Sequence, residues 1–157
     1  MTQRFQAPKG TRDILPGDAA LWAAVEAAAR AVFGRYGFRE IRTPIFEETE
    51  LFARGVGESS DIVGKEMYSF VDKGERHLTL RPENTASVVR AYVEHGMHRQ
   101  PQPVKLFYIG PQFRYERPQK GRYRQCHQIG CGAFGVAEPL VDAEQIAPLE
   151  DYLRRLG

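Results

Sequence analysis

The sequence predicts an α+β domain in which helices flank an antiparallel sheet. Residues 18–36 carry apolar side chains at helical spacing, and residues 66–80 and 104–135 are each typical of a β-hairpin. The sequence also lacks a GxGxxG segment and a Walker phosphate loop, because Glu66 follows Gly64-Lys65 where serine or threonine would bind magnesium. These absences argue against the two commonest nucleotide-binding folds and leave the antiparallel arrangement.

Length and composition indicate one soluble domain over residues 1–157. The hydrophobic content of 42% and the charged content of 27% are ordinary for a globular protein, and a net charge of +2 is too small to indicate nucleic-acid binding by itself. Cys126 and Cys131 form neither a CxxC pair nor a zinc-ligand spacing, which is typical of reduced thiols in the cytoplasm. No apolar run approaches the roughly 18 residues of a membrane span, so we expect a cytoplasmic protein without a membrane segment.

The helix over residues 18–36 is the clearest element. Asp18 is a favourable N-cap, and Gly37 can supply the left-handed residue that ends the helix. Residues 38–43 then predict a strand that ends at Pro44. A helix with this much apolar surface needs a sheet or a partner chain to cover it. Its apolar positions are Leu21, Trp22, Val25, Ala28, Ala29, Val32, Phe33 and Tyr36.

The next segment, residues 47–60, is mostly polar and predicts a loop in which Gly55 and Gly57 let the backbone approach a ligand. Residues 66–70 and 77–80 then flank a turn that contains Gly74, which predicts the first hairpin. The second strand of this hairpin leads directly into Arg81-Pro82-Glu83-Asn84-Thr85.

This strand-to-helix corner is a candidate binding site. Asn84 or Thr85 can cap the helix that follows, and the Glu83 carboxylate can point into a cleft and meet an ammonium group. The alternative is that Glu83 only complements the helix dipole, worth about 0.3–1 kcal/mol. His95 and His98 have the spacing of helical metal ligands, but they stand near a helix end with no cysteine nearby, so we expect no protein-bound metal.

The second hairpin carries the strongest charge cluster. Its strands are predicted at residues 106–109 and 123–129, joined by a loop over residues 116–121 that is too long for a tight turn. Five cations within eleven positions surround this loop. Because an arginine guanidinium can donate two hydrogen bonds to the oxygens of one phosphate, a polyanion is the predicted ligand. The alternative is a solvated basic hairpin. Beyond it, residues 142–156 predict a helix that Pro148 should kink or shorten, at about 3 kcal/mol if it is interior. The five cations are Arg114, Arg117, Lys120, Arg122 and Arg124.

Several stretches carry a resemblance that covers the whole chain. The run FRYERPQKGRYRQ at residues 113–125 resembles motif 2 of class II aminoacyl-tRNA synthetases, in the wording of the histidyl-tRNA synthetase family. APKGTRDILP is similar to the opening of that family, LRPENT to its LRPEGT segment, and the helix, strand and Pro44 to class II motif 1. The resemblance implies the antiparallel sheet of that class, and motif 1 implies a homodimer interface.

The same resemblance implies ATP-dependent charging of tRNA(His) with histidine. Magnesium would arrive with ATP rather than in a protein cage. Catalysis would rest on positioning and on charge stabilisation at the α-phosphate. By this resemblance Arg114 contacts the α-phosphate and the carboxylate, Glu116 faces the adenine amino group, Glu83, Thr85 and Gln128 bind histidine, and Arg117, Lys120 and Arg122 meet the tRNA acceptor end.

The chain also departs from the family pattern. Gly132 stands where the family has a glutamate that helps to hold histidine, Cys126 replaces a phenylalanine that stacks on adenine, and Asn84 replaces a glycine, a mild change because asparagine tolerates unusual backbone angles. Motif 3, the histidine-specificity segment and an anticodon-binding domain do not occur before Gly157. Because catalytic groups act as a unit, we expect the chain alone to be inactive or nearly so.

Two other functions remain open. One is a non-catalytic relative, such as the synthetase-like regulatory subunit of ATP phosphoribosyltransferase in histidine biosynthesis. The other is a module that binds tRNA or a dimer partner through the basic hairpin and the motif 1 face. The sequence does not decide whether the chain is a fragment, a split gene product or a degenerate paralogue.

Overall fold

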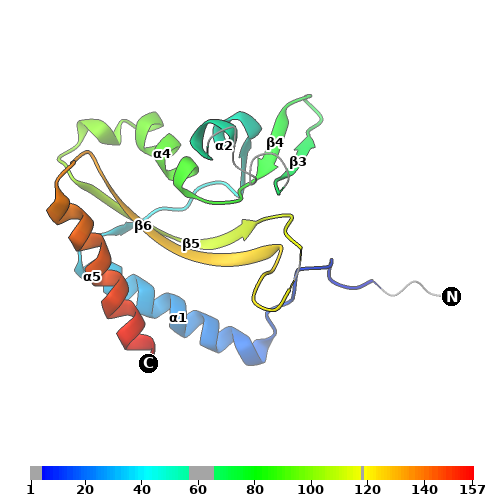
Figure 1. The fold of residues 1–157 in the computed structure, drawn as a ribbon, viewed down its shortest axis with the longest axis horizontal. Coiled ribbons are helices and arrows are strands. Elements are labelled where there is room, and N and C mark those ends of the chain that lie inside the picture. Colours follow the sequence, from blue (N-terminus) through cyan, green and yellow to red (C-terminus); the bar gives the residue numbers. More distant parts are fainter. Residues whose placement is uncertain (1–4, 57–65, 118) are drawn as a thin grey trace. The chain divides into compact units, whose positions relative to one another are not determined.

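The computed structural model describes residues 5–56, 66–117 and 119–157, which form two compact units (Figure 1). Unit 1 comprises Met1–Ile14, Pro44–Ser87 and Pro111–His127. Unit 2 comprises Leu15–Thr43, Val88–Gly110 and Gln128–Gly157. The division into functional domains therefore stays a prediction, whereas the α+β class is confirmed by the mixture of helices and sheets.

Helix α1 spans Pro16–Arg35 and begins two residues earlier than predicted. Leu15 is the N-cap and makes no side-chain hydrogen bond, so the assignment of the cap to Asp18 was wrong. Pro16 explains the earlier start, because its fixed φ suits the first helical position and its missing N–H has no partner to lose there. Asp18 lies inside the first turn, where its charge still complements the helix dipole.

The end of α1 confirms the predicted glycine stop. Gly37 has a φ of 79°, and its N–H donates to the Gly34 carbonyl at 3.1 Å. The Phe38 N–H donates to the Phe33 carbonyl at 3.0 Å, which completes a Schellman motif. The rings of Phe33 and Phe38 meet edge to face, so the turn is fixed by packing as well as by hydrogen bonds.

The larger sheet has the order β1-β5-β6, with β1 at Arg39–Glu40, β5 at Val104–Phe113 and β6 at Gln125–Phe134. The β1 strand is shorter than predicted and pairs with β5 in parallel, with Arg39 opposite Leu106, a pairing that the predicted antiparallel sheet did not specify. β5 and β6 both extend further than the apolar runs indicated.

Within unit 2, the β5 strand is apolar on both faces. Phe107 and Ile109 pack with α1 and with α5, two helices that contact each other and cross in Figure 1. Val104, Leu106 and Tyr108 point the other way, where Leu106 and its neighbours meet Val88 of α4, the helix at Thr85–Glu94. Because side chains alternate along a strand, two helix layers cover this sheet. A short 3₁₀ turn, η1, at Met97–Arg99 follows α4.

Helix α5 spans Pro139–Leu156 and is not shortened by Pro148, which is buried inside it. Its start lies three residues before the predicted Asp142 because Pro139 again stands at the first helical turn. Two contacts to neighbouring elements hold it: Tyr36 donates to Asp151 at 2.6 Å, and Lys105 of β5 pairs with Glu144 at 2.7 Å.

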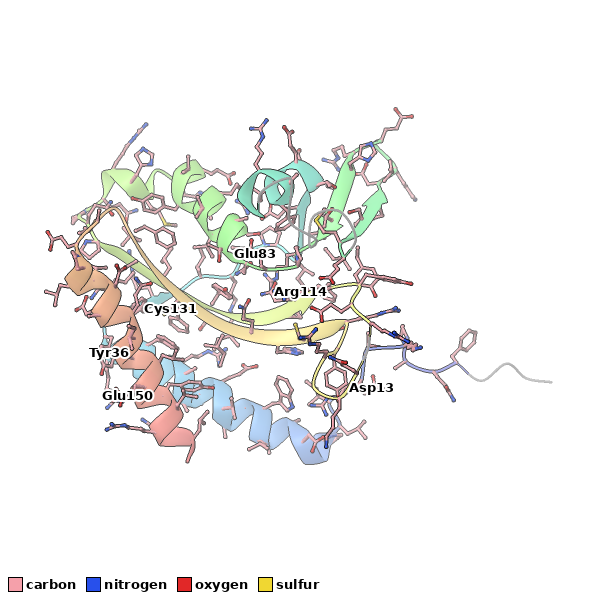
Figure 2. All side chains as sticks on the ribbon, in the orientation of Figure 1. Asp13, Tyr36, Glu83, Arg114, Cys131 and Glu150 are labelled. Carbon is pink, nitrogen blue, oxygen red and sulfur yellow. The ribbon has the colours of Figure 1, made fainter. Side chains whose placement is uncertain are left out.

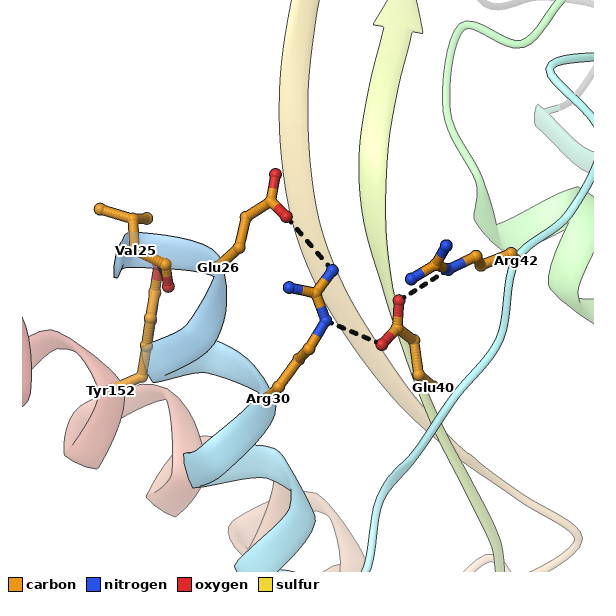
Figure 3. Close-up of polar contacts among 6 residues, drawn as sticks. All are labelled: Val25, Glu26, Arg30, Glu40, Arg42 and Tyr152. Carbon is orange, nitrogen blue, oxygen red and sulfur yellow. Dashed lines mark hydrogen bonds and ion pairs between the residues drawn. The ribbon is translucent and has the colours of Figure 1, made fainter. Parts of the chain in front are cut away.

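A cluster of ion pairs joins α1 to β1 (Figure 3). Arg30 lies between Glu26, one helical turn away at 3.2 Å, and Glu40 on β1 at 2.9 Å. Arg42 contacts the other carboxylate oxygen of Glu40, also at 2.9 Å. These two guanidinium groups hold the pKa of Glu40 below its ordinary value of 4.5, the hydrogen bond from Arg30 being the largest cause.

Unit 1 contains the smaller sheet, with the order β2-β4-β3. β3 at Tyr68–Val71 and β4 at His77–Leu80 form the predicted antiparallel hairpin. The sequence analysis missed β2 at Phe46–Glu48 and α2 at Thr49–Val56, which lie in the segment expected to be a loop. Gly55 belongs to α2, whereas Gly57 and the rest of the expected loop up to Ser60 lie outside the described residues.

Candidate active site

The strand-to-helix corner is organised by Glu83. Its two carboxylate oxygens accept hydrogen bonds from the backbone N–H groups of Thr85 at 2.6 Å and Ala86 at 2.9 Å. These are the first two residues of α4. The side chain that caps the helix is thus Glu83, whereas the prediction named Asn84 or Thr85. Each carboxylate oxygen can accept a further hydrogen bond, so the cap fixes Glu83 in place and leaves it able to meet an ammonium group.

A buried arginine, Arg81, is hydrogen-bonded to residues of this corner. Arg81 donates through Nε to the Pro111 carbonyl at 2.9 Å and through Nη1 to the Asn84 side-chain oxygen at 3.3 Å. Asn84 is buried and does not have a positive φ; Glu75 alone does among the described residues other than glycine. Asn84 therefore does not need the backbone freedom of the glycine that it replaces, and its side-chain oxygen accepts a hydrogen bond from Arg81.

Arg114 is held beside the same corner. Its Nε donates to the Pro82 carbonyl at 2.8 Å, which fastens the guanidinium to the main chain one residue before Glu83 (both residues are labelled in Figure 2). Its backbone N–H donates to the Arg124 carbonyl at 2.9 Å on the facing strand. The Nη groups of Arg114 remain on a partly exposed surface, with Glu116 as a distant neighbour at 3.8 Å. The contacts thus bring together Glu83, Arg114 and Glu116 from separate parts of unit 1.

Glu116 lies between two guanidinium groups. Its carboxylate oxygens are 3.8 Å from Arg114 and 3.9 Å from Arg122, distances at which attraction holds but no hydrogen bond forms. The side chain is mostly covered, whereas Arg122 is exposed. This leaves the acceptor oxygens of Glu116 available to a ligand that carries N–H groups.

The connection between β5 and β6 contains a tight turn, although the predicted loop over residues 116–121 was considered too long for one. Gln119 and Arg122 exchange backbone hydrogen bonds of 2.9 and 3.3 Å, so Lys120 and Gly121 form a two-residue tight turn inside the longer connection. Gly121 has a φ of 84°, which a side chain would strain. The predicted tRNA-contact residues Arg117, Lys120 and Arg122 are all exposed at this end.

Gln128, the remaining predicted histidine contact, belongs to unit 2. Its side-chain oxygen accepts a hydrogen bond from the Tyr108 hydroxyl at 3.3 Å. Sequence reasoning missed both Tyr108 and Gly130, where an added Cβ would stand 2.4 Å from the Tyr108 ring. The alternation of Gln128, Gly130 and Gly132 along β6 was the available signal, because every second residue shares a face.

The departures from the family pattern have definite surroundings. A Cβ at Gly132 would lie 3.1 Å from the ring of Phe134, so any side chain there requires that ring to move. Cys126 is half-buried, with its sulfur 3.9 Å from the Gln112 carbonyl. Burial raises the pKa of the Cys131 thiol, which disfavours the thiolate and with it nucleophilic chemistry.

An N-terminal turn adds residues that the predictions did not include. Thr11 folds back on the Pro8 carbonyl through its N–H and its hydroxyl, at 2.9 and 2.7 Å. The Gly10 carbonyl accepts the Arg124 N–H at 2.7 Å, and an added Cβ at Gly10 would stand 2.7 Å from the Arg124 side chain. The glycine of the PKGT segment is thus needed for close contact with the second hairpin.

The described part of the chain lacks a membrane-spanning helix and a metal-binding cluster. No helix there is long and apolar enough to cross a membrane. No group of three or more histidine, cysteine, aspartate or glutamate side chains there is placed to hold a metal ion.

Comparison with known proteins supports the resemblance. The family model described as histidyl-tRNA synthetase matches residues 10–157. The chain is 62% identical over 153 residues to a histidine–tRNA ligase of Desulfitobacterium hafniense, and 65% identical over 154 residues to one of Anaeromyxobacter dehalogenans. Each match covers 98% of this chain but only 36% and 37% of the relative, so the chain spans little more than a third of their length.

Solved structures agree with this result. The structure of apo Staphylococcus aureus histidyl-tRNA synthetase superposes with a TM-score of 0.83 at 45% identity, over 98% of this chain and 35% of the other. A Bacillus halodurans protein described as an ATP phosphoribosyltransferase regulatory subunit/histidyl-tRNA synthetase superposes with a TM-score of 0.82 at 25% identity, over 99% and 39%.

Proposed function

The chain belongs to the histidyl-tRNA synthetase family, in which it corresponds to the N-terminal part of the catalytic domain, and we propose that it supplies ATP- and histidine-binding groups for the activation of histidine. The observation that carries the proposal is the 2.8 Å hydrogen bond from Arg114 to the Pro82 carbonyl. This bond ties a guanidinium to the main chain one residue before Glu83, which supports a corner that offers a cation for phosphate and an anion for ammonium.

The proposed roles follow from the charges of these groups. Arg114 stabilises the negative charge that develops on the α-phosphate, Glu116 accepts from the adenine amino group, and Glu83 receives the α-ammonium of histidine. Thr85 and Gln128 complete the histidine contacts, and Mg²⁺ enters with ATP as part of the substrate. The exposed cations of the tip bind the acceptor end of tRNA(His), and a homodimer forms through α1 and β1, where Leu21 is exposed.

The chain by itself is proposed to be inactive or nearly so, since it spans about a third of its relatives. The test is histidine-dependent ATP–pyrophosphate exchange, run on the 157-residue chain and on a fusion to the remaining part of the Desulfitobacterium enzyme. We expect exchange only in the fusion, and a drop of about 10²–10³-fold on Arg114→Ala, the usual cost of one lost oxyanion donor. Arg155→Ala, which removes an exposed arginine of α5, is the matched control.

Exchange by the chain alone would disprove the inactivity, and an unchanged rate in the Arg114→Ala fusion would disprove the role of Arg114.

A second candidate is a regulatory subunit of ATP phosphoribosyltransferase. The similarity to the Bacillus halodurans protein favours it, as do the missing side chain at Gly132 and the missing aromatic ring at Cys126. This candidate predicts co-purification with a phosphoribosyltransferase subunit together with no exchange in the fusion. The intact motif 2 sequence and Glu83 favour the synthetase.

A further inference from the structure

Unit 1 contains a cavity of about 360 Å³ that none of the proposed catalytic residues lines. It lies between the N-terminal turn, the smaller sheet and the second hairpin. Phe113 and Tyr115 line it, whereas the residue between them, Arg114, does not, because alternate residues of an extended chain point to opposite sides. The cavity is therefore separate from the corner formed by Glu83 and Arg114.

The walls of this cavity are largely apolar and include three aromatic rings, those of Tyr68, Phe113 and Tyr115. The rings of Tyr68 and Tyr115 meet edge to face at 5.3 Å, and Leu80 and Phe113 supply further apolar surface. Tyr115 is 53% exposed although it lines the cavity, so part of its side chain is open to a ligand. An exposed aromatic ring beside a cavity is the usual platform on which an unpaired base stacks.

The charged residues that line the cavity are positive. They are Lys9 and Arg124, and no acidic residue of the described part of the chain lines it. The Arg124 guanidinium lies 4.0 Å from the centre of the Tyr115 ring and donates to the Glu116 backbone carbonyl at 3.2 Å. Among residues 5–56, 66–117 and 119–157, neither Lys9 nor Arg124 forms an ion pair with a carboxylate. Two uncompensated cations at an aromatic cavity suit a ligand that combines a planar ring with a phosphate.

We propose that this cavity binds one unpaired nucleotide of an RNA chain, with its base against Tyr115 and its phosphate near Lys9 and Arg124. Its volume lies at the small end of the range of ligand pockets, which suits one nucleotide rather than two. The inference rests on the proposed function, because the RNA is the tRNA substrate. The exposed cations of the tip follow Tyr115 on the same hairpin and would bind neighbouring phosphates.

The experiment measures binding of a short, fluorescein-labelled oligocytidylate RNA to the 157-residue chain by fluorescence anisotropy at several salt concentrations. Tyr115→Ala should weaken binding about 5- to 150-fold, the range for one lost base–aromatic stack, without changing the salt dependence. Lys9→Ala should lower the slope of log affinity against log salt by about 0.7, the value for one phosphate on a single strand. Lys73→Ala, at an exposed lysine of the β3–β4 turn, should change neither quantity, and Tyr115→Phe should restore the affinity.

The other outcomes separate this inference from the proposed function. Binding that falls with Arg117→Ala and Lys120→Ala but not with Tyr115→Ala or Lys9→Ala would overturn the cavity site and leave the basic tip as the tRNA contact. Competition by free AMP at a concentration equal to that of the RNA would assign the cavity to a free nucleotide instead. A change of oligomeric state in Tyr115→Ala without loss of RNA binding would show that the cavity is an interface between copies.

Discussion

The two units bury different kinds of residue. Among the described residues, the buried apolar side chains belong to unit 2, apart from Phe52, Leu78 and Pro82, whereas all the buried polar or charged residues belong to unit 1. In unit 2, Phe33 of α1 stacks on Phe107 of β5 at 5.3 Å. In unit 1, buried Arg81 bonds to main-chain and side-chain oxygens. The buried polar residues of unit 1 are Thr79, Arg81, Asn84, Ser87 and Gln112.

This difference separates stability from chemistry. Apolar contacts are non-directional and tolerate small shifts, so they suit the part that holds the fold together. Buried polar groups need partners at fixed distances and angles, and a satisfied network fixes one geometry. The corner that carries Glu83 and Arg114 lies in the polar unit, where position matters most.

The largest expected loss of stability follows from a substitution in the apolar core of unit 2. Phe33→Ala removes a ring that is 2% exposed and in contact with Phe38, Phe107 and Tyr152. We expect the free energy of unfolding to fall by about 3–5 kcal/mol. Urea unfolding monitored by Trp22, the only tryptophan and a residue of α1, measures it. Leu21→Ala, which removes a 67% exposed side chain from the same helix, should change it by less than about 0.5 kcal/mol. Equal losses in both variants would contradict the assignment of the core.

A smaller loss is expected in the polar unit. Arg81→Met keeps the aliphatic stem but removes the donors to Pro111 and Asn84. We expect a loss of about 2–3 kcal/mol, since buried acceptors are left without a charged donor. Circular dichroism in urea measures it. The control is Arg54→Met at an exposed ion pair with Glu50, which should cost no more than about 0.5 kcal/mol.

Gln112 differs from the other buried polar residues of unit 1 that form hydrogen bonds. Its side chain is 1% exposed, and neither of its polar atoms has a hydrogen-bond partner among the described residues. Gln112→Met should therefore leave the free energy of unfolding unchanged or raise it by about 1 kcal/mol. Asn84→Leu, by contrast, removes an acceptor of Arg81 and should cost about 1–3 kcal/mol. A clear loss of stability in Gln112→Met would reveal a bound partner for the amide, such as an ordered water.

Periodicity and turn chemistry predicted much of the fold. The helical spacing in α1, Gly37 and the two hairpins were recognised because each signal lies within a few neighbouring residues. β2 and α2 were missed because they are short, polar and stabilised by pairing with β4 and by burial of Phe52. The parallel pairing of β1 with β5 joins residues more than sixty positions apart, which no local pattern encodes.

The candidate site was predicted in its residue types and not in its geometry. The resemblance named Glu83, Arg114 and Glu116, but it did not predict that the Glu83 side chain caps α4. Nor did it predict the hydrogen bond from Arg81 to the Pro111 carbonyl, which joins residues thirty positions apart. The need for glycine at Gly10 and Gly130 depends on the side chains of Arg124 and Tyr108 that pack against them, and only the alternation along β6 gave a sign of it at Gly130. Such contacts exist only in the folded chain.

The smallest effect concerns the ion pairs between α1 and β1, the polar feature of the apolar unit (Figure 3). Arg30 and Arg42 lower the pKa of Glu40, so the folded state holds the carboxylate ionised at a pH where the unfolded chain begins to protonate it. The stabilisation is therefore present above pH 4.5, the ordinary pKa, and is lost as the pH falls through the lowered value. Glu40→Gln should cost about 0.5–1 kcal/mol at neutral pH, a modest figure because the guanidinium groups are partly solvated, and the difference from the unsubstituted chain should disappear in acid. Unfolding by urea at a series of pH values measures it, with Glu150→Gln at the exposed pair with Arg154 as the control, expected to cost about 0.3–0.5 kcal/mol. If the loss of unfolding free energy in Glu40→Gln stays constant as the pH falls, the loss comes from poorer packing of the glutamine amide. The ion-pair cluster would then contribute no pH-dependent stability.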